Sequence, residues 1–306
     1  MGSLDGRVAI ITGGGNGIGA SISRLFAKEG AKLVINDLGA NPDGTGGDEG
    51  PAKVIAEEIN AAGGAAEHDG GDIAAVETGE RLVAKAIDAY GKLDIVVNVA
   101  GILRDRMIFN LDEKDWDAVV RVHMKGTYST VRPASAYWRE QRNPDGNFRV
   151  INFTSASGLH GSPGQPNYAA AKMGIVGLTW SLARGMAKYG VTANAIAPGA
   201  ATRLTATIPQ EKRMGDGNND PSNDPKTSPD NVALPVAYIA SERAKWLTGR
   251  IISASGYHVG LYNSPEEIAA VDADARWELG ALSDKFESDF KPLADGLVPS
   301  PFDAQL

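Results

Sequence analysis

The 306-residue sequence contains no cysteine. Disulfides, thiolate nucleophiles and zinc sites built from cysteine are therefore excluded, and we expect no bound metal. A chain without cysteine suits a reducing compartment, so we expect a cytoplasmic protein.

Long apolar stretches are also missing. None approaches the roughly 20 residues of a transmembrane helix, and the apolar run near the N-terminus is too short for a signal peptide. Basic residues are in the minority, with 30 Lys and Arg against 38 Asp and Glu, which gives a net charge of −8. This balance argues against nucleic acid or a membrane as a partner. We therefore expect chemistry on a small molecule.

Short apolar runs rich in β-branched residues recur along the chain. Each is bounded by Gly, Asp or Asn, as are strands buried on both faces. Helical stripes of apolar residues alternate with them, the clearest being Ile18, Ile22, Leu25 and Phe26. This alternation predicts an α/β fold with a doubly wound, Rossmann-like parallel sheet that binds ligands at the carboxyl ends of its strands. The expected strands are 7–11, 32–36, 93–97, 148–153, 191–196 and 250–254, and further helices are expected within 76–90, 114–131 and 170–188.

No long polar linker divides the sequence, so we expect one catalytic, dinucleotide-binding domain over residues 1–261. Two segments interrupt the pattern: a Gly- and Asp-rich loop at 39–50, and a polar stretch at 214–230 inside a predicted lid at about 203–231. Residues 262–306 keep isolated large apolar residues among charges. We expect them to form a C-terminal extension that packs on the domain or lies at a subunit contact.

The turn "TGGGNGIG" (12–19) joins the first expected strand to the first helix. Its glycines allow the backbone to approach a pyrophosphate, which the helix N-terminus can then receive. The predicted cofactor contacts in this turn are Gly13, Asn16, Gly17, Ile18 and Gly19.

Asp37 closes the next strand, 18 residues beyond Gly19. A carboxylate there accepts hydrogen bonds from the adenosine ribose, although an ordinary turn acid is the alternative. The same carboxylate repels a 2′-phosphate, and no Arg or Lys lies within 12–19 or 37–41 to bind one. NAD is therefore favoured over NADP as the cofactor.

The stretch "NYAAAK" (167–172) places Tyr168 and Lys172 four residues apart, about 5–6 Å apart on one face of a predicted helix. An ammonium group at that distance would bring the pKa of the phenol down to about 8, near the pH at which a general acid/base must work. Chance alone would produce roughly 0.4 such pairs in this composition, so the context decides. Ser155 ends a strand 13 residues earlier and could hold a substrate oxygen. A capping role for Ser155 is the alternative, and Ser157 is a rival for the catalytic role.

Taken together, "TGGGNGIG", Asp37, "NVAG" (98–101), Ser155, "YAAAK" (168–172) and "PG" (198–199) resemble the short-chain dehydrogenase/reductase family over roughly residues 4–260. The resemblance implies that Ser155 orients the substrate and that Tyr168 exchanges its proton. It implies that Lys172 tunes Tyr168 and binds the nicotinamide ribose, and that the protein forms a homo-oligomer, a tetramer or a dimer. The further cofactor contacts that it implies, beyond Tyr168 and Lys172, are Asp72, Ile73, Asn98, Ala100, Gly101, Pro198, Gly199 and Thr202.

Two positions depart from the family pattern. Val99 replaces an asparagine in "NVAG", and His123 in "VHMKG" (122–126) stands in the place of a helix asparagine that is often counted as a fourth catalytic residue. Because His123 continues a stripe with Trp116 and Thr127, a packed core histidine is the favoured interpretation. Whether the proton relay survives through the backbone stays open.

A narrower resemblance lies in "NDLG" (36–39), "AGILRDR" (100–106), "VHMKG" and "TSASG" (154–158). These segments are similar to the (3R)-hydroxyacyl-CoA dehydrogenase domains of peroxisomal multifunctional enzymes of type 2 and related hydroxysteroid dehydrogenases. The resemblance implies an NAD-dependent oxidoreductase that interconverts a secondary alcohol and a ketone by hydride transfer, on an acyl-CoA thioester or a steroid. The alternatives are an NADPH-dependent 3-oxoacyl reductase and a nucleotide-sensing protein without catalysis.

Overall fold

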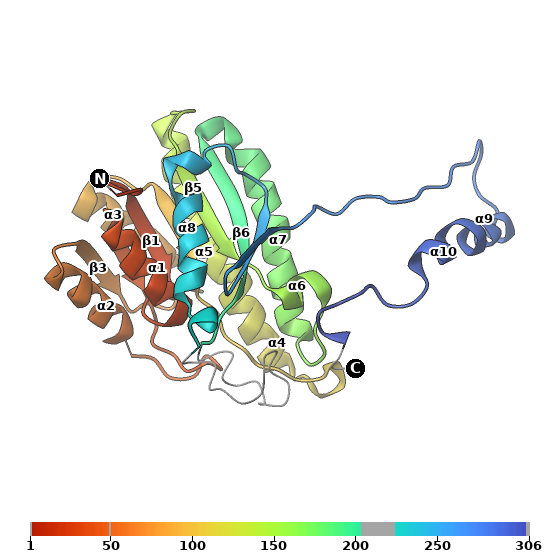
Figure 1. Cartoon of the computed structure of the whole chain (residues 1–306), viewed down its shortest axis with the longest axis horizontal. Coiled ribbons are helices and arrows are strands. Elements are labelled where there is room, and N and C mark those ends of the chain that lie inside the picture. The colour runs from red at the N-terminus through yellow and green to blue at the C-terminus, as the bar shows by residue number, and fades with distance from the viewer. Residues whose placement is uncertain (1, 49, 203–223, 304–306) are drawn as a thin grey trace.

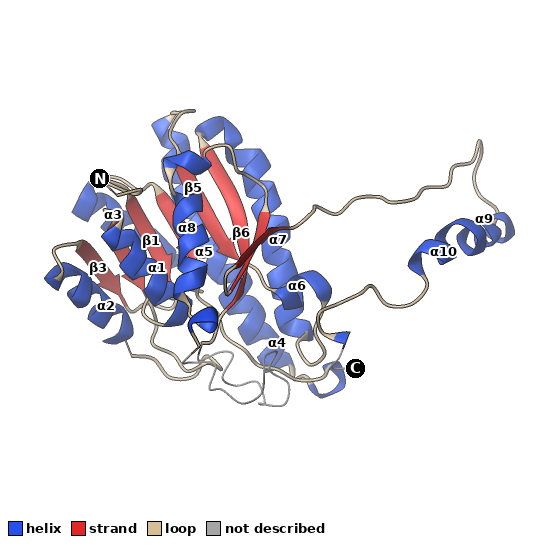
Figure 2. Cartoon of the chain, in the orientation of Figure 1, coloured by secondary structure: helices blue, strands red, loops and turns tan. Residues whose placement is uncertain are grey.

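The computed structural model describes residues 2–48, 50–202 and 224–303. These residues form one eight-stranded sheet in the order β3-β2-β1-β4-β5-β6-β7-β8, seen near the middle of the body in Figure 2. All neighbouring strands are parallel except β7 and β8, which are antiparallel. The strands are β1 (Val8–Thr12), β2 (Lys32–Asn36), β3 (Ala65–Asp69), β4 (Ile95–Asn98), β5 (Phe148–Phe153), β6 (Val191–Gly199), β7 (Ile251–Ser255) and β8 (His258–Leu261).

Helices cover both faces of the sheet, which buries β1, β2, β4 and β5 almost completely (Figure 1). One face packs against α1, α2 and α8, whose buried side chains include Phe26, Ile55 and Val236. The other face packs against α3 and α5, with Leu82 and Trp138 at its centre. The helices are α1 (Gly17–Lys28), α2 (Gly50–Ala61), α3 (Val76–Tyr90), α4 (Glu113–Val120), α5 (Gly126–Gln141), α6 (Ala156–His160), α7 (Pro166–Met186), α8 (Asp230–Ala240), α9 (Leu279–Lys285) and α10 (Lys291–Ala294).

Two π-helical segments interrupt longer helices. The first, η2 (Arg121–Lys125), separates α4 from α5, and the second, η9 (Phe286–Phe290), separates α9 from α10. The remaining short elements are the 3-10 turns η1 (Ile108–Asn110), η3 (Ala187–Tyr189), η7 (Pro225–Thr227) and η8 (Glu242–Ala244).

The strand order reverses beside β1, which pairs with β2 on one side and β4 on the other. Thr12 is in register with both Asn36 and Asn98. The segments that leave these three strands therefore begin side by side, at the position where open α/β sheets bind ligands.

The predicted α/β fold is confirmed, and each of the six expected strands is present within a few residues. The sequence interpretation missed β3 and β8, which are the two edge strands and carry half-exposed or polar residues in place of an apolar run. The single helix expected over 114–131 is in fact α4, η2 and the start of α5.

Beyond Tyr262 the chain leaves the body, and α9 and α10 lie apart from the sheet and its helices (Figure 1). Of the predicted lid at 203–231, residues 203–223 lie outside the described residues. Residues 224–231 form η7 and the start of α8. No described helix has the length and apolar character needed to cross a membrane.

Candidate active site

A cleft of about 270 Å³ opens at the carboxyl ends of the strands around the reversal point. The glycine-rich turn, the segments after β2, β3 and β4, the end of β5 and α7 all line it. Of the predicted residues, those that line the cleft are Gly13, Asn16, Gly17, Ile18, Gly19, Asp37, Asp72, Ile73, Ala100, Gly101, Tyr168, Lys172, Pro198 and Thr202.

The glycine-rich turn is built for close backbone approach. Gly13 has φ +66°, and a Cβ there would lie 2.8 Å from Ala100 N. A Cβ at Gly19 would lie 2.0 Å from Gly13 O, so the start of α1 can rest directly on the turn. Asn16 precedes α1, and its side-chain Nδ2 is buried without a hydrogen-bond partner in the described chain. An orphaned donor beside a helix N-terminus suits the pyrophosphate of a dinucleotide.

Asp37 lies in the cleft directly after β2 and is buried. Its Oδ2 accepts a hydrogen bond from Gly15 N at 2.9 Å, and its Oδ1 accepts one from Gly39 N at 2.8 Å. Each oxygen keeps a second lone pair for a ribose hydroxyl. Arg121, which also lines the cleft, forms an ion pair with Asp72 at 2.5 Å.

Tyr168 and Lys172 lie on the first turns of α7, which begins at Pro166. Lys172 is buried and donates from Nζ to Phe153 O at 2.7 Å, while the same Nζ lies 5.6 Å from the centroid of the Tyr168 ring. Ser155 caps the N-terminus of α6, where its Oγ accepts a hydrogen bond from Ser157 N at 3.2 Å. The Ser155 side chain interacts with the Tyr168 phenol and lowers its pKa. The structure thus brings the three predicted catalytic side chains together at the end of β5.

The expected pKa near 8 for Tyr168 is wrong for the protein without ligands. Burial of the phenol raises its pKa to about 12, with the charge of Asp105 adding to the rise and the hydrogen bond to Ser155 opposing it. Burial also lowers the pKa of Lys172 to about 7. A pKa near 8 requires a fully charged lysine in a partly solvated site. In the structure both groups are removed from water, and burial favours the neutral form of each.

His123 is buried in the π-helical turn η2, which confirms the packing part of its interpretation. It also lines the cleft and meets the Tyr168 ring edge-on, with ring centroids 5.2 Å apart. Its Nε2 lies 2.9 Å from Ile102 O, and its Nδ1 is buried without a partner among the described residues. Burial and the charge of Lys172 lower the pKa of His123 well below its usual value, so the imidazole is neutral at physiological pH.

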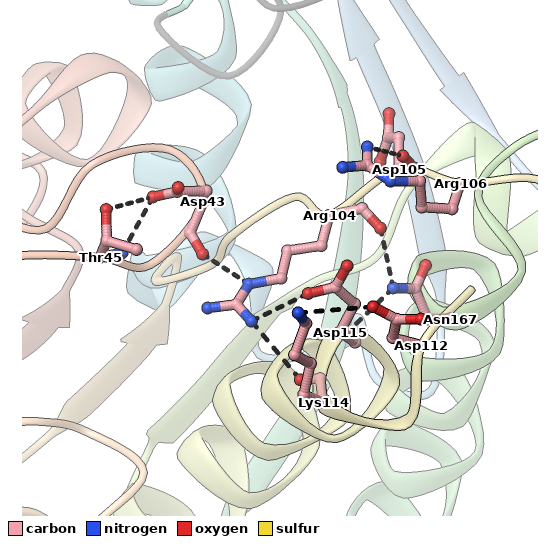
Figure 3. Close-up of polar contacts among 9 residues, drawn as sticks. All are labelled: Asp43, Thr45, Arg104, Asp105, Arg106, Asp112, Lys114, Asp115 and Asn167. Atoms are coloured by element: carbon pink, nitrogen blue, oxygen red, sulfur yellow. Dashed lines mark hydrogen bonds and ion pairs between the residues drawn. The ribbon is translucent and has the colours of Figure 1, made fainter. Parts of the chain in front are cut away.

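A polar network connects the start of α7 to α4 and to the segment after β4 (Figure 3). Arg104 donates from Nε to Asp43 O at 2.8 Å and pairs through Nη1 with Asp115 at 3.1 Å. Asn167 is fully buried and donates to Arg104 O and Asp115 O at 3.1 and 3.2 Å. Because Asn167 directly precedes Tyr168, this network fixes the position of the phenol.

Three predicted site residues do not line the cleft. Asn98 is buried behind it, where Nδ2 donates to Asn152 Oδ1 at 2.9 Å and Oδ1 accepts from Thr130 at 2.6 Å. Gly199 ends β6 against Ser255. Ser155 does not line the cleft itself, but its side chain interacts with Tyr168, which does.

The sequence interpretation missed the part played by the loop at 39–50. Ala40, Asn41, Pro42 and Gly44 line the cleft, and Leu103 N donates to Pro42 O at 2.9 Å. The high glycine content of this loop was a visible signal, since glycine permits close approach to a ligand. Which side of the sheet the loop would cover could not be read from it.

Comparison with known proteins gives consistent matches. The family model for short chain dehydrogenases matches residues 7–213. The chain is 38% identical over 287 residues to the peroxisomal hydratase-dehydrogenase-epimerase of Neurospora crassa, covering 93% of this chain but only 30% of that protein. It is 39% identical over 280 residues to the hydroxyacyl-CoA dehydrogenase ChsB1 of Mycobacterium tuberculosis, covering 89% of this chain and 84% of that one.

A solved structure agrees as well. The crystal structure of a short chain dehydrogenase from Mycobacterium avium superposes with a TM-score of 0.82 at 38% identity, over 98% of this chain and 99% of that chain. The similarity therefore extends to most of the residues that follow Tyr262, the point where the chain leaves the body.

Proposed function

Because this chain belongs to the short-chain dehydrogenase family, whose oxidoreductases use a nicotinamide nucleotide, we propose that it is an NAD-dependent dehydrogenase of 3-hydroxyacyl-CoA thioesters. The observation that carries the proposal is the convergence of Ser155, Tyr168 and Lys172 beside a cleft that opens with a glycine-rich turn. The acyl-CoA substrate is supported by the similarity to the hydroxyacyl-CoA dehydrogenase ChsB1 of M. tuberculosis.

Each of the three side chains has a role that fits its contacts. When bound, the nicotinamide supplies the hydride acceptor for oxidation. The Ser155 hydroxyl would hold the alcohol oxygen next to Tyr168, and the Tyr168 phenolate would accept the hydroxyl proton. Lys172 donates one hydrogen bond to Phe153 O, and its other N–H groups remain available to the hydroxyls of the ribose.

Replacement of Tyr168 by Phe tests the chemistry. The variant keeps the ring that packs against His123 but loses the proton acceptor, so we expect turnover to fall by at least about a thousandfold. NAD affinity, measured by fluorescence titration, should stay within a few fold. Tyr128→Phe makes the same change on an exposed side chain of α5 and should retain full activity. Normal turnover in the Tyr168 variant contradicts the assignment.

Two comparisons test the substrate and the cofactor. Oxidation of 3-hydroxyacyl-CoA thioesters, hydroxysteroids and simple secondary alcohols should give the highest kcat/KM with the thioesters. The support for NAD is the buried Asp37 carboxylate in the cleft. A clear preference for NADP(H) would instead favour a 3-oxoacyl reductase.

We further propose a cytoplasmic location, supported by the absence of cysteine. Cell fractionation tests it, and recovery of the enzyme in an organelle contradicts it.

A further inference from the structure

Asp105 lies in the segment between β4 and η1 and is not one of the residues that line the cleft. Its Oδ2 accepts a hydrogen bond from Gln165 Nε2 at 2.8 Å. Its Oδ1 is buried and has no partner among the described residues. No ion pair balances this carboxylate among the described residues. Burial raises the pKa of Asp105, while the hydrogen bond from Gln165 and the charge of Arg106 oppose the rise.

A chain of hydrogen bonds joins Asp105 to the catalytic serine. Gln165 Oε1 accepts from the Ser157 hydroxyl at 2.7 Å, and Ser157 N donates to Ser155 Oγ at 3.2 Å. Gln165 also directly precedes Pro166, the first residue of α7. Asp105 therefore reaches both the turn that carries Ser155 and the helix that carries Tyr168.

Two other ionisable side chains, those of His123 and Lys172, lie near the Tyr168 ring. His123 on η2 is neutral because its pKa is far below the usual value, and Lys172 on α7 loses its proton near pH 7. The charge of Asp105 adds to the rise that burial gives the pKa of Tyr168. Near Asp105 itself, the Arg106 guanidinium is exposed and bonds to the Asp105 backbone carbonyl, so it compensates the carboxylate only partly.

We propose that Asp105, held by Gln165, is a positioning residue of this active site: it orients the Ser155 turn and supplies the unbalanced negative charge beside the Tyr168 hydroxyl. The charge keeps the phenol protonated and so favours its action as a proton donor in reduction. Oxidation, which needs the phenolate, is shifted to more alkaline pH. The inference rests on the proposed function for its kinetic consequence, but not for its effect on the ionisation of Tyr168.

The kinetic test is the pH dependence of kcat/KM for oxidation of a 3-hydroxyacyl-CoA by NAD. Because removal of a like charge lowers the pKa of a phenol, Asp105→Asn should move the alkaline rise to lower pH by about one unit. Asp105→Glu keeps the charge and should leave the midpoint in place, although the plateau falls if the longer side chain displaces Gln165. Asp112→Asn removes the same charge from an exposed side chain just before α4 and should shift nothing.

A second measurement needs no turnover. With tyrosine labelled at Cζ, carbon NMR follows the ionisation of Tyr168 in the ligand-free protein, and Tyr168→Phe identifies its signal. The Asp105→Asn protein should begin to ionise at lower pH than the wild type, and the Asp105→Glu protein at the same pH.

The outcomes separate the two hypotheses. If Tyr168 titrates identically in the wild type and in folded Asp105→Asn, the inference is wrong whatever the enzyme oxidises. If the titration shifts but no hydroxyacyl-CoA is oxidised, the inference stands and the proposed function fails. If Asp105→Asn and Asp105→Glu both lose plateau rate while the midpoint of the pH profile stays in place, Asp105 has only a structural role. That result would overturn the electrostatic role.

Discussion

Lys172 combines a chemical task with an unfavourable position. Its ammonium must be taken out of water to reach the cleft, and it receives one hydrogen bond acceptor, Phe153 O, in return. Burial lowers its pKa to about 7, against 10.5 for the ordinary side chain. A buried amine of this kind is typical of functional sites, because stability alone would favour an apolar residue.

This pKa predicts how stability changes with pH. Between about pH 7 and 10.5 the unfolded chain keeps a proton on Lys172 that the folded protein has lost, so the free energy of unfolding rises with pH across this window. Lys172→Met should remove that rise and make the protein more stable near pH 7, with a higher Tm, while turnover is lost. Thermal melts from pH 6 to 9.5 measure it. Lys188→Met, on an exposed side chain, should follow the wild type; an equally steep rise in the Lys172 variant rejects the prediction.

Asp37 makes a second prediction at the scale of one residue. Its two oxygens already order Gly15 N and Gly39 N, so the carboxylate stands fixed in the cleft. Asp37→Asn removes the charge at nearly constant shape. We expect kcat/KM with NAD to fall about tenfold, in proportion to weakened hydrogen bonds of about 1.4 kcal/mol, and the value with NADP to rise. The exposed control Asp117→Asn should leave both constants unchanged. An unaltered NAD/NADP ratio in Asp37→Asn counts against the ribose contact.

At the scale of elements, one arginine connects three segments around the cleft: the loop at 39–50, α4 and the start of α7. Arg104 links the loop at 39–50 to α4, and Asn167 passes the same network to α7 (Figure 3). The ion pair with Asp115 is three-quarters or more buried on each side. Such partly buried pairs matter mainly when one partner is removed, because the other is left without compensation.

Arg104→Met should therefore release the loop at 39–50 from α4 and also make the start of α7, where Tyr168 lies, less firmly held. We expect the KM for the cofactor to rise several fold and kcat to fall, with a loss of stability of about 1–3 kcal/mol. Steady-state kinetics and denaturant unfolding measure both effects. Arg132→Met breaks an exposed pair with Glu80 and should cost less than about 1 kcal/mol, with no kinetic change. Equal behaviour of the two variants would show that the Arg104 network does not position the site.

Elements that leave a pattern of residues along the chain, such as an apolar run or a fixed spacing, were predictable from the sequence. The central strands carry uninterrupted apolar runs because both faces are covered, and the Ser155, Tyr168 and Lys172 spacing follows from one strand end and one helix. Edge strands such as β3 lack that signal, and the π-helical turn at η2 leaves no mark in apolar spacing. The pKa of Tyr168 and its link to Asp105 depend on burial and on contacts across 60 residues of sequence, which spacing does not contain.

The whole molecule divides into a nearly neutral body and an acidic arm. Residues 263–303 contain ten acidic and three basic residues, against 28 and 27 in the rest of the chain. Among the described residues, the hydrogen bonds of this arm join its residues only to one another. Large apolar side chains stay exposed on it, including Leu279 at 81% and Val298 at 83%. The continuous helical stretch 279–294 is at most marginally stable alone in water, so a partner surface would stabilise it.

We propose that this arm is a contact between subunits, and that its partner is a second copy of the chain. The body offers matching apolar residues along its β8 edge, where Val259 and Leu261 are more than half exposed. A chain that ends at Tyr262 should therefore keep its fold and its sheet but form a smaller assembly, because the apolar surface that the arm buries is lost. Light scattering coupled to size-exclusion chromatography gives the masses of both forms.

The matched variant keeps the arm but changes its surface: Leu279→Asp together with Phe286→Asp should reproduce the smaller assembly, since charge at these exposed positions opposes burial in an interface without touching the body. A control with Ser283→Asp, on the same helix, tests whether added charge alone is enough, and it should leave the mass unchanged. If the truncated chain assembles to the same mass as the full chain, the arm does not hold subunits together. In that case the exposed apolar residues serve another partner, and the assembly must rest on the body.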